Sequence, residues 1–157
     1  MSRIRNAFDA TALRQYFVEF LGTLLFVFMA TGVVVSTTYA GGMNSGAIVA
    51  IGLGFGFSLA AMIFAAANYS GGHLNPAVTA AFIATNDIQF LKGIFYILSQ
   101  LAGAMVGSAL LRATTPEVGK LAIICTTIAK FLILTLSITQ RGEQQALEPR
   151  KLAQIYR

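Results

Sequence analysis

The side chains best placed to do chemistry lie in one polar stretch between two long apolar segments. The stretch occurs once in the chain, as Ser70-Gly71-Gly72-His73-Leu74-Asn75-Pro76-Ala77-Val78-Thr79. Asn75 is a favoured helix-capping residue, and Pro76 then stands at the first helical position, where its missing N–H is no loss. A helix is therefore predicted to begin here. Because membrane proteins accept irregular backbone at membrane depth only where it is packed in protein or lines a wet cavity, the loop indicates a pore.

Asn75 carries a specific hypothesis about this pore. Its side-chain oxygen can cap the short helix while its NH₂ group points into the pore and donates to a passing water or hydroxylic solute. The positive end of the helix dipole, near the membrane midplane, would repel cations and orient water so that proton relay is interrupted. The alternative interpretation is an ordinary Asn-Pro helix start in a loop.

The sequence contains no recognisable catalytic or metal-binding arrangement. His73 is the only histidine, and no Cys, Asp or second His stands at a metal-ligand spacing from it. His73 is therefore interpreted as a hydrogen-bonding residue of the loop and a candidate pore residue. There is no Ser-His-Asp arrangement, no paired carboxylates and no phosphate-binding loop, so we expect no enzyme activity, no cofactor and no metal.

The composition is that of a membrane protein. Of the 157 residues, 56% are hydrophobic and only 11% are charged, whereas soluble domains carry about 25% charged residues. The formal net charge is +5, but the basic residues neither cluster in one block nor alternate with aromatic residues. Nucleic acid is therefore not an expected partner, and the lipid bilayer is.

Three apolar segments are long enough to cross a bilayer, at 16–38, 47–67 and 90–111. A weaker fourth candidate covers residues 121–139 and is interrupted by Lys130. The helix that begins at Asn75 is expected to end near Thr85, which makes it about 15 Å long, half of a hydrocarbon core about 30 Å thick. The predicted fold is an all-α membrane protein with three transmembrane helices, one re-entrant half-helix, and a weaker fourth span before a polar tail.

The distribution of basic residues predicts the orientation. If the N-terminus is cytoplasmic, two basic residues outside the spans lie on the far side, Arg112 and Lys120. Eight lie inside, namely Arg3, Arg5, Arg14, Lys92, Arg141, Arg150, Lys151 and Arg157. This bias predicts an integral, multi-pass membrane protein with a cytoplasmic N-terminus, and it does not indicate which membrane.

Glu19 and Gln100 are polar residues within predicted spans, where such groups usually face the bundle interior and bond to a partner. The loop needs partners, because the backbone groups of so short a helix and its approach cannot all pair internally. We therefore expect Glu19 and Gln100, with the loop residues Gly71 and Gly72, to support the re-entrant loop. The alternative for Glu19 is a carboxylate that reaches toward the end of its span.

Two glycine pairs predict close helix packing. Gly52 and Gly56 in the second span, and Gly103 and Gly107 in the third, each leave a helix face without side chains. The alternative is that glycines are simply common in membrane helices.

These residues together resemble the aquaporins of the major intrinsic protein family. The resemblance covers residues of roughly 12 to 115 and rests on three segments, Glu19-Phe20-Leu21-Gly22-Thr23, Gly71 to Thr79, and Gln100-Leu101-Ala102-Gly103-Ala104. It implies passive conduction of water, with Asn75, Pro76 and Ala77 as the first of two pore signatures. It also implies that Phe55 holds the second-span position of the aromatic selectivity constriction, as in water-selective members.

The chain also departs from the family pattern. Members are inverted repeats whose two Asn-Pro-Ala ends meet at the midplane. The prolines here are Pro76, Pro116 and Pro149, so a second signature is missing from this sequence. Residues from about Pro116 do not resemble the family's fourth helix, as expected of a truncated form. The predicted organisation is a cytoplasmic segment 1–15, a first repeat 16–115, and a divergent segment 116–157.

Three functions stay open at this point. The first is a channel for water. The second is a facilitator for glycerol, ammonia or another small neutral solute. The third is a non-conducting form that associates with itself or with full-length relatives through its glycine-lined helix faces.

Overall fold

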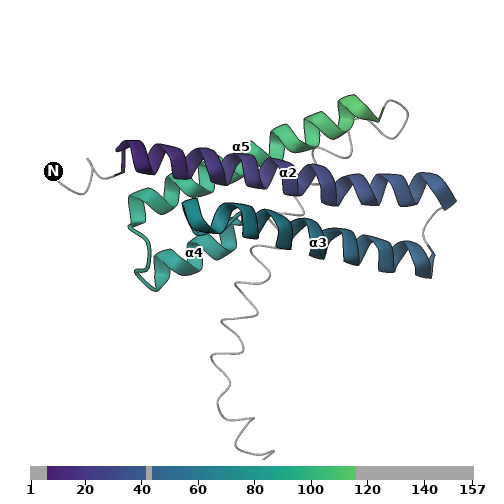
Figure 1. Ribbon diagram of the computed structural model, residues 1–157, viewed down its shortest axis with the longest axis horizontal. Coiled ribbons are helices and arrows are strands. Elements are labelled where there is room, and N and C mark those ends of the chain that lie inside the picture. Colours follow the sequence, from purple (N-terminus) through teal and green to yellow (C-terminus); the bar gives the residue numbers. More distant parts are fainter. Residues whose placement is uncertain (1–6, 42–43, 116–157) are drawn as a thin grey trace, which may run out of the picture.

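The computed structural model describes residues 7–41 and 44–115. This part of the chain forms four helices and no strand: α2 (Ala10–Gly41), α3 (Ser45–Ser70), α4 (Pro76–Ala84) and α5 (Phe90–Thr114). Figure 1 shows three long helices, with the short α4 between α3 and α5 at one end of the bundle. The predicted fold class is thereby confirmed for the described residues. The fourth candidate span, 121–139, lies outside them.

Helices α2 and α3 begin before the predicted spans, and a polar cap stands at the start of each. Asp9 Oδ1 accepts a hydrogen bond from the N–H of Ala12 at 2.6 Å at the start of α2. Asn44 Oδ1 caps α3 in the same way, because it accepts a hydrogen bond from the N–H of Ala47 at 2.9 Å. At the other end of α3, Gly71 adopts a left-handed φ of 92° and its N–H bonds to Ala67 O. Such a glycine is a common helix terminator.

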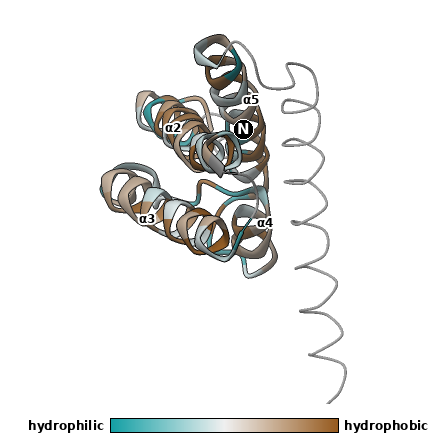
Figure 2. Ribbon diagram, turned by 90° about the vertical axis from the view of Figure 1, so that its right-hand side faces the viewer, coloured by the Kyte–Doolittle hydropathy of each residue, from teal (hydrophilic) through white to brown (hydrophobic). Residues whose placement is uncertain are grey.

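The three long helices are long and apolar enough to cross a membrane. Their most apolar windows have mean hydropathies of 2.2, 2.3 and 1.7. Large apolar side chains remain exposed on the outer faces, as in Phe57 at 71% and Phe64 at 86%. Figure 2 shows hydrophobic colouring around these helices. Exposed surfaces of this size are suited to lipid rather than to water.

The buried core lies between α2 and its two neighbours. One cluster joins Phe26, Val27 and Ala30 of α2 to Ala104 of α5, with side chains of α3 packed against it. Gly103 and Gly107 lie directly on the α2 backbone, because a Cβ added at either would stand 2.3 Å from Phe20 O or 2.4 Å from Leu24 O. The two helices therefore touch backbone to backbone.

The second glycine pair does not pack within the described part of the chain. A Cβ added at Gly52 or Gly56 would meet nothing within 4 Å, whereas one at Gly54 would stand 2.8 Å from Val33 of α2. Since successive residues of a helix are about 100° apart, Gly54 faces α2 and places Gly52 and Gly56 on nearly the opposite side. The expectation of close packing by this pair is thus not met by any described neighbour.

Candidate functional site

The half-helix α4 begins at the predicted residue and has the predicted length. Asn75 is its N-cap, and the Asn75 side chain accepts the N–H of Ala77 at 2.8 Å, with Pro76 in the first helical turn. The helix ends at Ala84, with Thr85 as its C-cap. Nine residues correspond to about 14 Å, less than half of a hydrocarbon core. This helix can enter a bilayer but cannot cross it.

The loop before α4 is a tight turn that folds back on α3. Gly71, Gly72 and Leu74 have positive φ values of 92°, 64° and 47°. At Gly72 a Cβ would stand 3.1 Å from Ile63 O, so the loop backbone lies against the α3 backbone there. Positive φ and close approach both favour glycine at this position. Leu74 holds its strained conformation because its side chain is fully buried against Gly22 of α2.

The Glu19 carboxylate of α2 is the centre of the loop's support. Its Oε1 accepts hydrogen bonds from Ser70 Oγ at 2.6 Å and His73 N at 3.0 Å. Its Oε2 accepts from Leu74 N at 2.7 Å and Gln100 Nε2 at 2.8 Å. Glu19 is fully buried, so it does not reach toward the end of its span. Four donors match the acceptor capacity of one carboxylate, so α2, α3, α5 and the loop are joined at one side chain.

A second shared group is the Thr79 hydroxyl, one turn into α4. Gln100 Nε2 donates to Thr79 Oγ1 at 2.9 Å, and His73 Nδ1 lies 3.1 Å from the same oxygen. The hydroxyl itself donates to Asn75 O at 3.2 Å. A hydroxyl has one hydrogen, so when it is given to Asn75 O, the hydroxyl accepts from both other groups and the His73 proton is on Nδ1. Thr79 thereby links α5 to the loop and to the first turn of α4.

His73 is enclosed rather than solvent-exposed. Its ring centroid lies 4.4 Å from that of Phe82 and 5.3 Å from that of Tyr96. Together with the contact of its Nδ1 to Thr79, these ring contacts make His73 a hydrogen-bonding group of the loop.

The predicted site residues fall into two groups in the structure. Glu19, Gln100, His73 and the loop glycines come together around α4, where Asn75 and Ala77 are half-buried and Pro76 is buried. Phe55 lies apart from that network, 38% exposed and in edge-to-face contact with Phe26 at 6.1 Å between centroids.

Sequence reasoning missed three residues of the network, Ser70, Thr79 and Tyr96. Tyr96 OH donates to Ser70 O at 2.8 Å and so fixes the last residue of α3. Thr79 could have been found as the residue four positions after Asn75, the spacing at which a hydroxyl meets a helix carbonyl. For Tyr96 the sequence offers no comparable signal, because its partner is 26 residues away.

Replacing Thr79 by valine is expected to lower the free energy of unfolding by about 2 kcal/mol, because a buried N–H of Gln100 loses its acceptor and the His73 ring loses its Nδ1 partner. Thr85→Val is the matched control: its hydroxyl also bonds to helix carbonyls, but it is exposed, so we expect a change within about 0.5 kcal/mol. Unfolding of the purified chain in detergent micelles measures both. Equal stability of the two variants would contradict the shared role of Thr79.

Comparison with known proteins decides the family. The chain matches the family model described as Major intrinsic protein over residues 6–148. It belongs to the major intrinsic protein family. The expected resemblance is confirmed, and the matched range reaches past residue 115 into the segment described above as divergent. Since members of this family are channels and not enzymes, the protein is not an enzyme.

Curated relatives from plants and animals agree with this assignment. The chain is 39% identical over 116 residues to "Probable aquaporin TIP2-2" of Oryza sativa subsp. japonica, a match that covers 72% of the chain and 47% of the relative. It is 40% identical over 108 residues to "Aquaporin-5" of Ovis aries, a match that covers 69% of the chain and 39% of the relative. The chain therefore spans about half the length, or less, of these relatives. Together with its three span-length helices, family membership makes it an integral, multi-pass membrane protein.

Proposed function

We propose that the chain supplies half of a passive conduit for water, with Asn75 as the residue that contacts the solute. The observation that carries this proposal is the short helix α4, capped by Asn75 and held in place by the hydrogen bonds around Glu19. We call these residues the Glu19 network: Glu19, Ser70, His73, Leu74, Thr79, Tyr96 and Gln100. A loop fastened by so many buried hydrogen bonds keeps one polar group at a defined position. Such preorganisation is what selective passage of a small molecule requires.

The free hydrogen-bonding group at this position is a donor. The Asn75 side-chain oxygen is occupied by the N–H of Ala77, and its NH₂ group bonds to no residue in the described part of the chain. An NH₂ group donates to water or to a hydroxylic solute and repels neither. Asn75 therefore suits a neutral solute with an available lone pair.

The dipole of α4 excludes cations at the same place. Its first turn contains no acidic residue, so nothing on α4 neutralises the partial positive charge at its N-terminus. A cation that approaches Asn75 meets this charge and a donor, while water meets only a favourable partner. The conduit is thus proposed to pass water and small neutral molecules, with Phe55 as the proposed aromatic residue of the constriction.

The proposed orientation places the N-terminus in the cytoplasm. Because α2 and α3 are antiparallel neighbours, the loop after α3 returns to the side from which the chain starts (Figure 1). The half-helix then enters from the cytoplasmic side. The excess of basic residues predicted for that side supports this arrangement.

A vesicle swelling assay with Asn75 variants tests the function. Asn75→Ser keeps a capping oxygen and removes the NH₂ donor, so we expect a folded protein with water permeability lowered about three- to tenfold, the effect of one net hydrogen bond. Asn75→Ala loses the cap as well and is expected to conduct no better than Asn75→Ser. The same assay with glycerol separates a water channel from a solute facilitator.

Vesicles with the wild-type chain are expected to be more permeable to water than empty vesicles. If the Asn75→Ser variant is then as permeable as the wild type, the role of Asn75 is contradicted. Wild-type permeability equal to that of empty vesicles would favour a second function, association with further copies or with full-length relatives. A specific observation supports that alternative: the most apolar window of α3 is 11% buried, against 39% in α2 and α5. The proposed contact face contains Gly52 and Gly56, beside which the described part of the chain leaves open space.

A further inference from the structure

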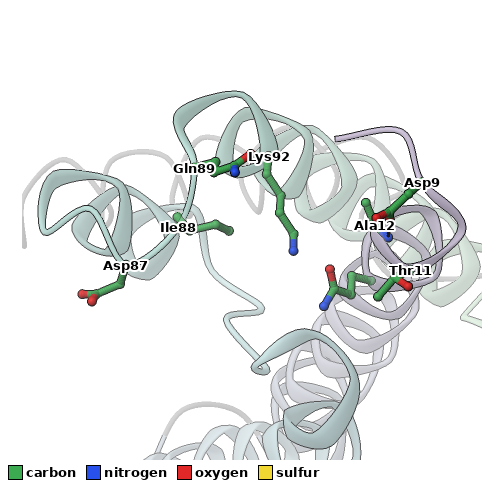
Figure 3. A pocket seen from close by; sticks show the side chains of 8 residues that line it. Asp9, Thr11, Ala12, Asp87, Ile88, Gln89 and Lys92 are labelled. Carbon is green, nitrogen blue, oxygen red and sulfur yellow. Dashed lines mark hydrogen bonds between the residues drawn. The ribbon is translucent and has the colours of Figure 1, made fainter. Parts of the chain in front are cut away.

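A second polar site lies away from the loop, where α2 and α5 begin and α4 ends. It is an open cavity of about 410 Å³, shown in Figure 3. Its walls come from the first turns of α2 and α5 and from the connection between α4 and α5, and they include Asp9, Gln15, Asp87 and Lys92. The volume is in the range of small-molecule sites. None of the residues of the Glu19 network lines it.

Lys92 supplies a cation inside this cavity, where its ammonium group also lies 6.0 Å from the ring centroid of Tyr96. Within residues 7–41 and 44–115, no carboxylate lies within 4.0 Å of its ammonium group, although Asp9 and Asp87 line the same walls. Figure 3 shows the Lys92 side chain extending into the cavity, while the Asp87 carboxylate points away from it. Lysine is a common ligand for phosphate, to which it donates as a point charge.

The opposite wall supplies acceptors. Gln15 Oε1 is buried and has no hydrogen-bond partner among the described residues. A buried acceptor without a partner is unfavourable, so a group that donates to it would be stabilised. Asp9 adds a carboxylate on this side, where one of its oxygens already caps α2 through Ala12 N. The cavity therefore offers a cation on one wall and acceptors on the other.

The position of the cavity points to the source of its ligand. The candidate spans of α2 and α5 start at Ala10 and Phe90, so the cavity lies at the level where a bilayer's headgroups would meet these helices. Two aromatic side chains at this end, Phe8 at 52% and Phe90 at 70%, are exposed. Exposed apolar rings of this size are suited to lipid rather than to water.

We propose that this cavity binds the headgroup of phosphatidylethanolamine. The phosphate accepts from Lys92, and the primary ammonium donates to Gln15 Oε1 and to the Asp9 carboxylate. Choline carries the same charge as ethanolamine but has no N–H, so it cannot satisfy the Gln15 acceptor. The site is thus expected to distinguish two lipids with the same phosphate and the same net charge. This inference does not depend on whether the chain conducts water.

Native mass spectrometry of the purified full chain tests the proposal without any substitution. We expect phosphatidylethanolamine to be retained about fivefold more than phosphatidylcholine or phosphatidylglycerol at equal concentration. Soluble glycerophosphoethanolamine is the third arm, and we expect it to displace the lipid only at far higher concentration. Equal retention of the ethanolamine and choline lipids would overturn the proposal, and so would equally tight binding of the soluble ester.

Two variants locate the site. Lys92→Gln is expected to reduce retention of phosphatidylethanolamine about fivefold, whereas Arg112→Gln, which removes a cation from the last turn of α5, is expected to leave it unchanged. Asp9→Asn keeps an oxygen to cap α2 and is expected to reduce retention of phosphatidylethanolamine while phosphatidylglycerol is unaffected. Equal retention by the Lys92 and Arg112 variants would place the lipid elsewhere on the protein.

Discussion

Replacing Glu19 by alanine is expected to lower the free energy of unfolding by about 2 to 6 kcal/mol, the largest effect of any single substitution considered. The value depends on whether each of the four donors has another acceptor once the carboxylate is removed. Ser70 Oγ still reaches Ala66 O, and Gln100 Nε2 still reaches Thr79 Oγ1. The backbone N–H groups of His73 and Leu74 have no such substitute, because both residues are buried. Two unsatisfied buried donors account for the estimate.

Since a protein's stability is about 5 to 15 kcal/mol in total, this loss is expected to release the loop even where the helices stay formed. Glu19→Gln tests the chemistry more finely. An amide of the same shape presents one oxygen and one NH₂ group, so two of the four donors would face another donor. We expect a loss that approaches that of the alanine variant.

Equilibrium unfolding in detergent micelles, followed by circular dichroism, measures both Glu19 variants. Asp87→Asn is the matched control, because Asp87 is an exposed carboxylate and its loss is expected to change stability by no more than about 0.5 kcal/mol. If Glu19→Ala unfolds with the same midpoint as Asp87→Asn, the carboxylate does not support the loop.

The second large effect is expected from adding a single methyl group at Gly103. In Gly103→Ala the new Cβ would stand 2.3 Å from Phe20 O and 3.1 Å from Phe20 C. Both atoms belong to the backbone of α2, so neither can rotate away as a side chain can. The helices must separate, and overpacking of this kind destabilises proteins by about 1 to 3 kcal/mol.

The separation would also reach the loop. Gln100 lies one turn before Gly103 on α5, and its hydrogen bond to Glu19 is 2.8 Å long. Moving α5 away from α2 lengthens this bond, so Gly103→Ala is expected to weaken the loop support together with the helix packing. Protection of the loop amides from hydrogen exchange, particularly at His73 and Leu74, reports this second effect.

Gly52→Ala is the matched control for the Gly103 variant. It adds the same methyl group to a helix glycine, but no atom of residues 7–41 or 44–115 outside the local helix backbone lies within 4 Å of the new atom. Because alanine favours helix over glycine by about 1 kcal/mol, we expect unchanged or slightly raised stability. Thermal unfolding of the two variants in the same detergent gives the comparison. A Gly103→Ala protein as stable as Gly52→Ala would show that α2 and α5 do not touch through their backbones.

The sequence alone determined the class of the protein and the start of the short helix on which its candidate site is built. Apolar run length and low charge predict membrane helices because the bilayer requires both. The Asn75-Pro76 pair predicts the start of α4 because capping and the fixed φ of proline act within a few residues. The polar residues Glu19 and Gln100 could be assigned to the loop, since a group that is unfavourable in lipid needs a partner.

Only the tertiary structure decided which residues meet across distances in the chain. The Glu19 bonds to His73 and Leu74 join residues 54 and 55 positions apart, and no local pattern encodes such a contact. The two glycine pairs have the same spacing in the sequence, yet Gly103 and Gly107 lie on α2 while Gly52 and Gly56 meet no neighbour among the described residues. Spacing places residues on a common helix face, but the rotation of each helix about its axis is decided by all the side chains it packs against.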